Sequence, residues 1–168
     1  MRRFLDGLYT ASAWLAGISM IGVLVMVLTT ILSRFFGIAV HGTDAYAGYA
    51  MAGAGFLALA TTLKHGEHIR VTLVIGALKG TAYKVAEVTA LTIATLLSAF
   101  LAFYSANLVI ESWEINDVSM GLDATPLWIP QLVMAVGTFM FFVAFCDELV
   151  LELLGKRERP AAEEAHHE

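Results

Sequence analysis

The sequence predicts an all-α integral membrane protein with four transmembrane helices, and three observations support this fold class. Apolar residues make up 58% of the 168 residues. Charged residues make up only 15%, below the roughly 25% typical of soluble domains, and the mean hydropathy is +0.74. Four windows without Asp, Glu, Lys or Arg are each long enough to cross about 30 Å of hydrocarbon at about 1.5 Å per helical residue.

The uncharged windows set the boundaries of the expected elements. They contain 27, 19, 23 and 23 residues and predict membrane spans at residues 11–33, 45–63, 88–110 and 124–146. Residues 1–154 thus form the predicted four-span membrane domain, and we expect the acidic remainder, residues 155–168, to be a disordered cytoplasmic tail. Arg2 and Arg3 precede the first span as in a signal peptide, but the apolar run exceeds a signal core of about 7–15 residues. We therefore expect it to be retained as the first helix.

The first two spans are bounded by polar residues that suit helix ends. Arg34 closes the first span, and Trp14 near its start is expected to anchor the helix at the headgroup boundary. Thr43 and Asp44 precede the second span and can accept hydrogen bonds from the free N–H groups of its first turn. We therefore expect the second helix to begin near residue 45.

The second span is the richest in small residues. Ala50, Ala54 and Ala58 recur at intervals of four, which places them on one side of a helix. In lipid, small residues allow another helix backbone to approach closely. The alternative is that these alanines simply face lipid. The predicted packing face comprises Ala50, Ala54, Gly55 and Ala58.

A charged segment, residues 64–71, separates the second and third spans. Its polar side chains are candidates for contact with a partner protein or with lipid phosphates, and the alternative is a plain positive anchor on the cytoplasmic side. These candidates are Lys64, His65, Glu67, His68 and Arg70. Residues 72–86 mix apolar side chains with Lys79 and Lys84 and are too short and too charged to span, so we expect an interfacial segment at the membrane surface.

The loop between the third and fourth spans is acidic. It contains no lysine or arginine, and its four carboxylates are Glu111, Glu114, Asp117 and Asp123. Pro126 and Trp128 open the fourth span, where proline costs little and tryptophan anchors the chain at headgroup depth. We expect Asp123 or Thr125 to cap this helix.

The lysines and arginines set the expected orientation. With four spans, the termini and residues 64–71 share one side of the membrane, and nine of the ten basic residues lie there, whereas Arg34 lies alone on the other side. Because short cytoplasmic loops carry the excess of Lys and Arg, both termini and the interfacial segment are expected to be cytoplasmic. A cysteine placed at Asn116 should then be labelled from outside.

The spans carry no candidate for catalysis or cofactor binding. None of the four windows contains Asp, Glu, Lys, Arg or His, whereas haem bundles and membrane enzymes need such groups at depth. Cys146 is the single cysteine, so no internal disulfide can form. His65 and His68, with Glu67, give at most an incomplete metal coordination sphere. We therefore expect no catalytic, cofactor or metal site, and the net charge of −5 gives no indication of nucleic-acid binding.

The deepest polar side chains are those of Thr29, Thr30 and Asn107. Polar side chains in membrane helices commonly hydrogen-bond across helix contacts, and we expect the same of these three. A transport path within the chain would require intramembrane charge, broken helices or internal repeats, and the sequence shows none of these patterns.

Several of these features together resemble the small membrane subunit of tripartite ATP-independent periplasmic (TRAP) transporters, the DctQ-like family. The resemblance covers the chain through Leu154 and includes four spans in a chain of this length. It rests on Arg34, Asp44, the run Gly66-Glu67-His68-Ile69-Arg70-Val71, and Thr125-Pro126-Leu127-Trp128. The family often carries two acidic residues before the second span, where this chain has Thr43-Asp44.

The resemblance implies a non-catalytic subunit of a bacterial inner-membrane transporter. Members assemble with a large multi-span permease subunit (DctM-like) that carries the sodium and substrate sites and works by an elevator-type motion. A periplasmic substrate-binding protein (DctP-like) delivers the substrate, commonly an organic acid anion. The small subunit would extend the fixed scaffold. The acidic loop residues become candidate contacts for the binding protein, with an ordinary solvated loop as the alternative.

A self-sufficient small channel or exporter is the competing interpretation. Such a protein would form a stable homo-oligomer around a polar pore stripe, and the four windows show no such stripe. A scaffold subunit would instead transport nothing alone and would co-purify with a much larger membrane protein.

Overall fold

The computed structural model describes residues 2–38, 40–64, 81–121 and 124–154, with side chains described from residue 5 onward. Most of these residues form four long helices: α1 (Arg2–Phe36), α2 (Thr43–Lys64), α4 (Thr81–Glu114) and α5 (Trp128–Leu153). Each of the four is long and apolar enough to cross a membrane. The predicted fold class, an all-α membrane protein with four spanning helices, is therefore confirmed.

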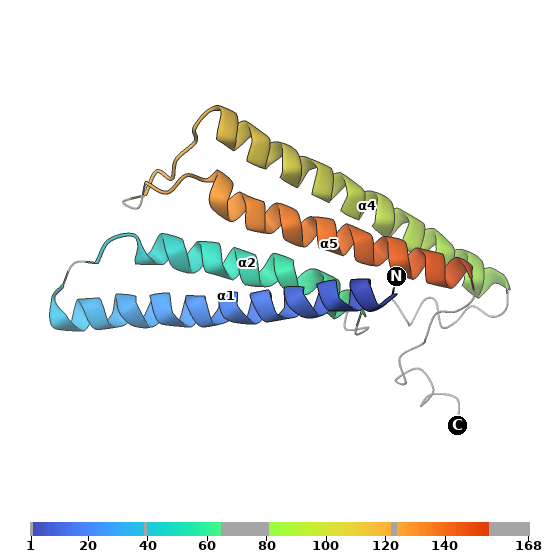
Figure 1. Ribbon diagram of the computed structural model, residues 1–168, viewed down its shortest axis with the longest axis horizontal. Helices are drawn as coiled ribbons and strands as arrows, with labels where there is room; N and C mark the ends of the chain where they lie inside the picture. Colours follow the sequence, from blue (N-terminus) through green and yellow to red (C-terminus); the bar gives the residue numbers. More distant parts are fainter. Residues whose placement is uncertain (1, 39, 65–80, 122–123, 155–168) are drawn as a thin grey trace, which may run out of the picture.

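The helices form two antiparallel hairpins, α1–α2 and α4–α5, which pack against each other through α2 and α5 (Figure 1). α2 and α5 run in the same direction at the centre, and α1 and α4 lie at the two outer edges. We call the end at which α2 and α5 finish the Lys64 end, after the last residue of α2. The opposite end is called the Glu114 end, after the last residue of α4.

The outer helices are longer than a membrane span requires. α1 has 35 residues and α4 has 34. At about 1.5 Å per residue, each exceeds the roughly 30 Å of hydrocarbon by about 20 Å. Residues 2–10, which precede the first predicted span, form the first turns of α1.

α4 also begins earlier than the sequence predicts. Residues 81–86, expected to belong to the interfacial segment, form the first turns of α4, so that boundary is corrected. Residues 81–86 contain no glycine or proline, so nothing in them interrupts a helix. Adding turns to an existing helix costs far less free energy than starting a new one. Residues 72–80 of the predicted segment lie outside the described residues.

The start of α5 differs from the prediction as well. α5 begins at Trp128, and its N-cap residue Leu127 makes no side-chain capping hydrogen bond. The hydroxyl of Thr125 donates instead to the Tyr46 hydroxyl of α2 at 3.1 Å, so the prediction that Thr125 caps α5 is wrong. Asp123, the alternative cap, lies outside the described residues.

The buried core is concentrated at the Lys64 end. Tyr9 of α1, Ala60 and Leu63 of α2, and Ala144 of α5 are buried together, and the partly buried side chains packed against them are Leu5, Met140, Phe141 and Phe145. The fully buried Ser12 of α1 donates its hydroxyl hydrogen to the Met140 sulfur of α5 at 3.2 Å. Three helices therefore meet at this end.

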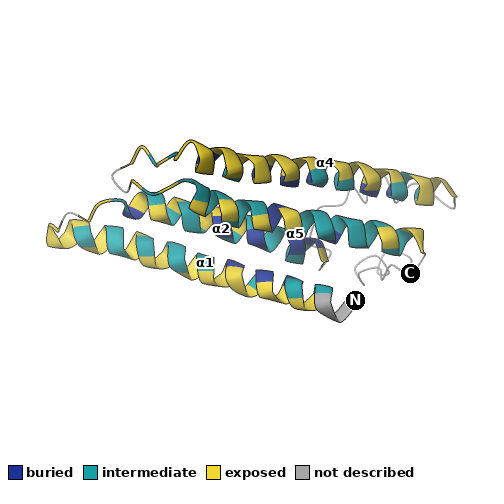
Figure 2. Ribbon diagram, turned by 45° about the horizontal axis from the view of Figure 1, so that its top comes forward, coloured by how far each residue is buried: buried dark blue, intermediate teal, exposed yellow. Residues whose placement is uncertain are grey.

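The outward surfaces of α1 and α4 are largely apolar and exposed (Figure 2). Ile18 and Ile21 on α1, like Leu96 and Leu97 on α4, are more than half exposed. A protein surrounded by water rarely leaves such extensive apolar surface uncovered. In a membrane, lipid or another membrane protein covers these faces.

The contact between α2 and α5 depends on a glycine. A Cβ atom added at Gly137 would lie 2.6 Å from the backbone C and O atoms of Phe56, far inside van der Waals contact. Gly53 of α2 is buried as well, and it faces Ser19 of α1 and Val133 of α5. These two glycines let α2 approach both of its neighbours, as small residues do in membrane helices.

α4 packs on α5 through a seam of small residues that the sequence pattern did not indicate. Leu91, Ser98, Ser105 and Ser112 are buried at intervals of seven residues, and Ala102 is buried between them. A seven-residue repeat keeps one side of a helix against its neighbour, and small side chains allow the two backbones to approach. The opposite side of α4 is left facing outward.

Candidate interaction surfaces

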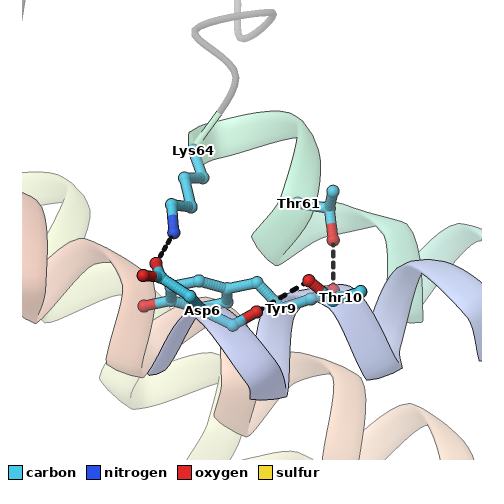
Figure 3. A network of polar contacts seen from close by, with 5 residues as sticks. All are labelled: Asp6, Tyr9, Thr10, Thr61 and Lys64. Carbon is cyan, nitrogen blue, oxygen red and sulfur yellow. Dashed lines mark hydrogen bonds and ion pairs between the residues drawn. The ribbon is translucent and has the colours of Figure 1, made fainter. Parts of the chain in front are cut away.

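Polar contacts join α1 to α2 at the Lys64 end (Figure 3). The Lys64 ammonium pairs with the Asp6 carboxylate and lies 4.9 Å from the centroid of the Tyr9 ring. The Thr61 hydroxyl donates to the Tyr9 backbone oxygen at 3.1 Å, and the Thr10 hydroxyl donates to the Asp6 backbone oxygen at 2.8 Å. The Lys64 and Thr61 contacts hold the start of α1 against the last turn of α2, whereas the Thr10 hydrogen bond lies within α1.

Lys64 was a predicted contact for a partner or for lipid, and the structure gives it a contact within the chain. Its side chain is 38% exposed and that of Asp6 is 54% exposed. An ion pair so open to its surroundings contributes only about 0–1 kcal/mol to stability. The remaining predicted contacts of this set lie outside the described residues: His65, Glu67, His68 and Arg70.

Backbone hydrogen bonds shape the α4–α5 loop at the Glu114 end. The Ser119 N–H donates to the Thr125 oxygen at 2.8 Å, and the Leu127 N–H donates to the Asp117 oxygen at 3.0 Å. Met120 lies in the loop between the hydrogen-bonded residues Ser119 and Thr125, and it is completely exposed. The loop is thus a folded projection beyond the end of α4.

Three of the four predicted contacts for a binding protein lie in the described residues. Glu111 and Glu114 are exposed on the last turn of α4, and Asp117 is half-buried in the loop. Asp123 lies outside the described residues. Among the described residues at this end, Arg34 is the only lysine or arginine. The Glu114 end therefore presents an acidic surface.

The predicted interface anchors lie toward opposite ends of the helices. Trp14 is 72% exposed in the first half of α1, which begins at the Lys64 end. Trp128 opens α5 at the Glu114 end and packs against Trp113 of α4, with ring centroids 4.8 Å apart. Pro126 is exposed just before it. Tryptophan toward both ends suits a chain that meets two headgroup regions.

The predicted packing face of α2 is divided between two environments. Ala50 lies against α1, since its Cβ is 3.6 Å from the position that a Cβ would take on Gly22. Ala54 and Ala58 are half-buried, and Gly55 is exposed with no atom within 4 Å of its missing side chain. One part of the face is thus turned toward α1, and Gly55 points away from the described helices.

The three deepest polar residues behave differently from one another. Thr30 donates to the Thr43 hydroxyl at 2.8 Å, which confirms an interhelical hydrogen bond for this residue. The Thr29 hydroxyl donates instead to the Val25 oxygen of its own helix at 2.8 Å. Asn107 is exposed on the outside of α4. The prediction of interhelical bonding is therefore wrong for Thr29 and for Asn107 within this chain.

The described residues offer no obvious site for a metal or for a charged substrate. They contain no group of three or more His, Cys, Asp or Glu side chains placed to hold a metal ion. A groove of about 360 Å³ runs between α4 and α5, and its apolar lining includes Ala102, Val109, Leu132 and Phe139. Such a lining suits an acyl chain or an apolar side chain and not an anion.

These features define a multi-pass helical membrane protein whose outer helices expose apolar faces and whose Glu114 end presents an acidic surface. A comparison with protein families matches residues 23–155 to the DctQ component of tripartite ATP-independent periplasmic transporters. Because the match covers most of the chain, the protein belongs to this DctQ family. A comparison with individually curated proteins finds no match.

The match begins in the second half of α1 and extends to the end of α5, so it includes all of α2, α4 and α5. It confirms the family resemblance found in the sequence. The chain is the small permease component of a tripartite transporter, and its family implies partner proteins in that transporter.

Proposed function

We propose that the chain is a non-catalytic scaffold and docking subunit of a secondary transporter in the bacterial inner membrane. It assembles with a large multi-span (DctM-like) subunit that carries the sodium and substrate sites. A periplasmic (DctP-like) binding protein delivers an organic acid anion to this pair. Membership of the DctQ family supports the proposal.

The main observation behind the proposal is the distribution of polar and apolar surface over the four helices. Inside the chain, α4 and α5 meet through a close seam of serine and alanine, and the groove beside it is apolar. A transporter working alone needs substrate or ion sites near mid-membrane. The broad apolar faces on α1 and α4 suit a subunit that is covered by lipid and by a larger membrane protein.

The same proposal assigns a direction to the chain. Lys64 and Lys84 lie at the Lys64 end, whereas Arg34 is the only lysine or arginine among the described residues at the Glu114 end. Because basic residues favour the cytoplasmic side, the Lys64 end with both termini faces the cytoplasm. Glu111, Glu114 and Asp117 then lie on the periplasmic side, where the carboxylates of the α4–α5 loop are available to basic groups of the binding protein.

A cysteine placed at Met120 in a Cys146→Ala chain is expected to react with a membrane-impermeant maleimide added to intact spheroplasts. Met120 is suitable because it is completely exposed, whereas the neighbouring Asn116 has a φ of 50° that a cysteine adopts less readily. A cysteine at Lys84 serves as the matched control and should react only after the membrane is opened. The reverse pattern would overturn the assigned orientation.

An affinity-tagged chain, expressed at native level in its own cells, is expected to recover a much larger multi-span membrane protein after mild detergent extraction. The reason is that its two outer apolar faces need a protein or lipid cover. Mass spectrometry of the purified complex provides the measurement. Recovery of a stable homo-oligomer with no larger membrane protein would contradict the proposal and favour a self-sufficient channel.

A further inference from the structure

The outer face of α4 carries polar groups within its predicted membrane span, residues 88–110, and just beyond the end of that span. Tyr104, Asn107, Glu111 and Glu114 follow one another at intervals of three or four residues and so share one side of the helix. All four are exposed. At about 100° per residue, Asn107 points away from Ser105, which is buried in the seam with α5. This face is therefore directed out of the chain.

Asn107 differs from the hydroxyl residues on the same helix. Thr92 and Thr95 each donate to a backbone oxygen of α4 at 2.7 Å and so need no partner. The Asn107 amide has two donor hydrogens and an acceptor oxygen, and it makes no hydrogen bond to the described part of the chain. It lies in the uncharged stretch 88–110, about 6 Å along the axis from Glu111. An amide left unpaired in hydrocarbon is costly.

The opposite edge of the molecule has a different surface. Between residues 15 and 33, every described residue of α1 classed as exposed is apolar, including Ile18, Leu24 and Leu28. The hydroxyls of Ser19 and Thr29 donate to backbone oxygens of α1 itself. The α1 edge is therefore suited to lipid, and the α4 edge is suited to a protein that can satisfy an amide.

We propose that the outer face of α4, formed by Tyr104, Asn107, Glu111 and Glu114, is the docking surface for a transmembrane helix of the large subunit. That helix carries a hydrogen-bonding side chain opposite Asn107 and a basic side chain near the carboxylates. The inference rests on the proposed function, because it assumes that such a subunit is present. It goes beyond that function by identifying the α4 edge as the part of the chain that contacts the large subunit.

The charges on this face distinguish the large subunit from other occupants. Lipid headgroups carry anionic phosphates, which are repelled beside Glu111 and Glu114. A second copy in the same membrane orientation would bring each carboxylate near its own counterpart, and like charges at an interface oppose association. A helix of different sequence can instead present a hydrogen-bonding group at the membrane depth of Asn107 and a basic group at the depth of the carboxylates.

The test compares the two edges with matched substitutions in the full chain, co-expressed with its large subunit. Asn107→Trp places an indole on the α4 face, and Leu28→Trp places the same side chain on the exposed face of α1 at a similar distance from the Glu114 end. Glu111→Lys reverses one exposed charge without touching the internal packing of the chain. The measurement is the amount of large subunit recovered per tagged chain, with the thermal stability of each variant measured in parallel.

Asn107→Trp and Glu111→Lys are each expected to lower recovery of the large subunit by about tenfold or more. Leu28→Trp should change recovery by less than about twofold, since peripheral contacts are close to neutral. Unchanged recovery with both α4 variants, or loss with Leu28→Trp alone, would overturn the docking face while leaving the proposed function intact. If the unmodified chain recovers no large subunit, the proposed function itself fails. Cross-linking of Asn107→Cys to a second copy, in a Cys146→Ala chain, would also overturn the inference.

Discussion

Replacing Gly137 by leucine is expected to separate α2 from α5 and to destabilise the isolated chain severely. The obstacle is the Phe56 backbone, whose C and O atoms lie 2.6 Å from the position of an added Cβ. Backbone atoms cannot rotate away as a side chain can, so the helices must move apart. Overpacking in close-packed interiors costs about 1–3 kcal/mol, and leucine adds further atoms to the same contact.

Gly48→Leu is the matched control for this experiment. Gly48 also lies inside a helix, but no atom lies within 4 Å of its missing side chain. The measurement is thermal unfolding of the detergent-purified chain, with size-exclusion chromatography to follow the folded species. We expect Gly137→Leu to lower the apparent Tm well below that of Gly48→Leu. Equal stability of the two variants would contradict the α2–α5 contact.

The positions of the four spans could be predicted from the sequence because charge marks them directly. A carboxylate or ammonium is costly in hydrocarbon, so long windows without such groups must be the segments that cross. Arg34 and Asp44 bound such windows, and α1 ends and α2 begins within two residues of them. The family resemblance rested on short runs at the same boundaries.

The packing between helices could not be predicted in the same way. Gly137, Gly48 and Gly55 look alike in the sequence, and only the path of a neighbouring helix makes one of them indispensable. Ser98 and Ser105 gave no signal because serine is tolerated both in lipid-facing and in buried positions of membrane helices. The pairing of α2 with α5 is a contact between segments far apart in the chain, and periodicity within one helix cannot reveal it.

The exposed amide of Asn107 shows how the structure changes a sequence expectation into a more specific one. The sequence predicts that this residue hydrogen-bonds to another helix. The structure turns it outward, away from α5 and from the rest of the described chain. The expected bond therefore moves from inside the chain to a contact with the large subunit, as proposed above.

Under the proposed function, uptake by the complete transporter is expected to require this chain as a scaffold and not as a transport site. The groove between α4 and α5 is lined by apolar residues, and the charges of the described loops lie toward the helix ends. A rigid pair of hairpins held by Gly137, Gly53 and the serine seam is suited to bracing a moving partner. In the proposed assembly, a large subunit without this chain would lack the fixed scaffold against which its moving part works.

Reconstitution of purified components into proteoliposomes tests this central claim most directly. Vesicles receive the large subunit, this chain or both, with the binding protein and radiolabelled mono- and dicarboxylate anions outside and an inward sodium gradient. The account predicts sodium-dependent uptake when all components are present, and none above background with this chain alone or with the large subunit alone. Robust uptake by this chain alone, or undiminished uptake when it is omitted, would contradict the account.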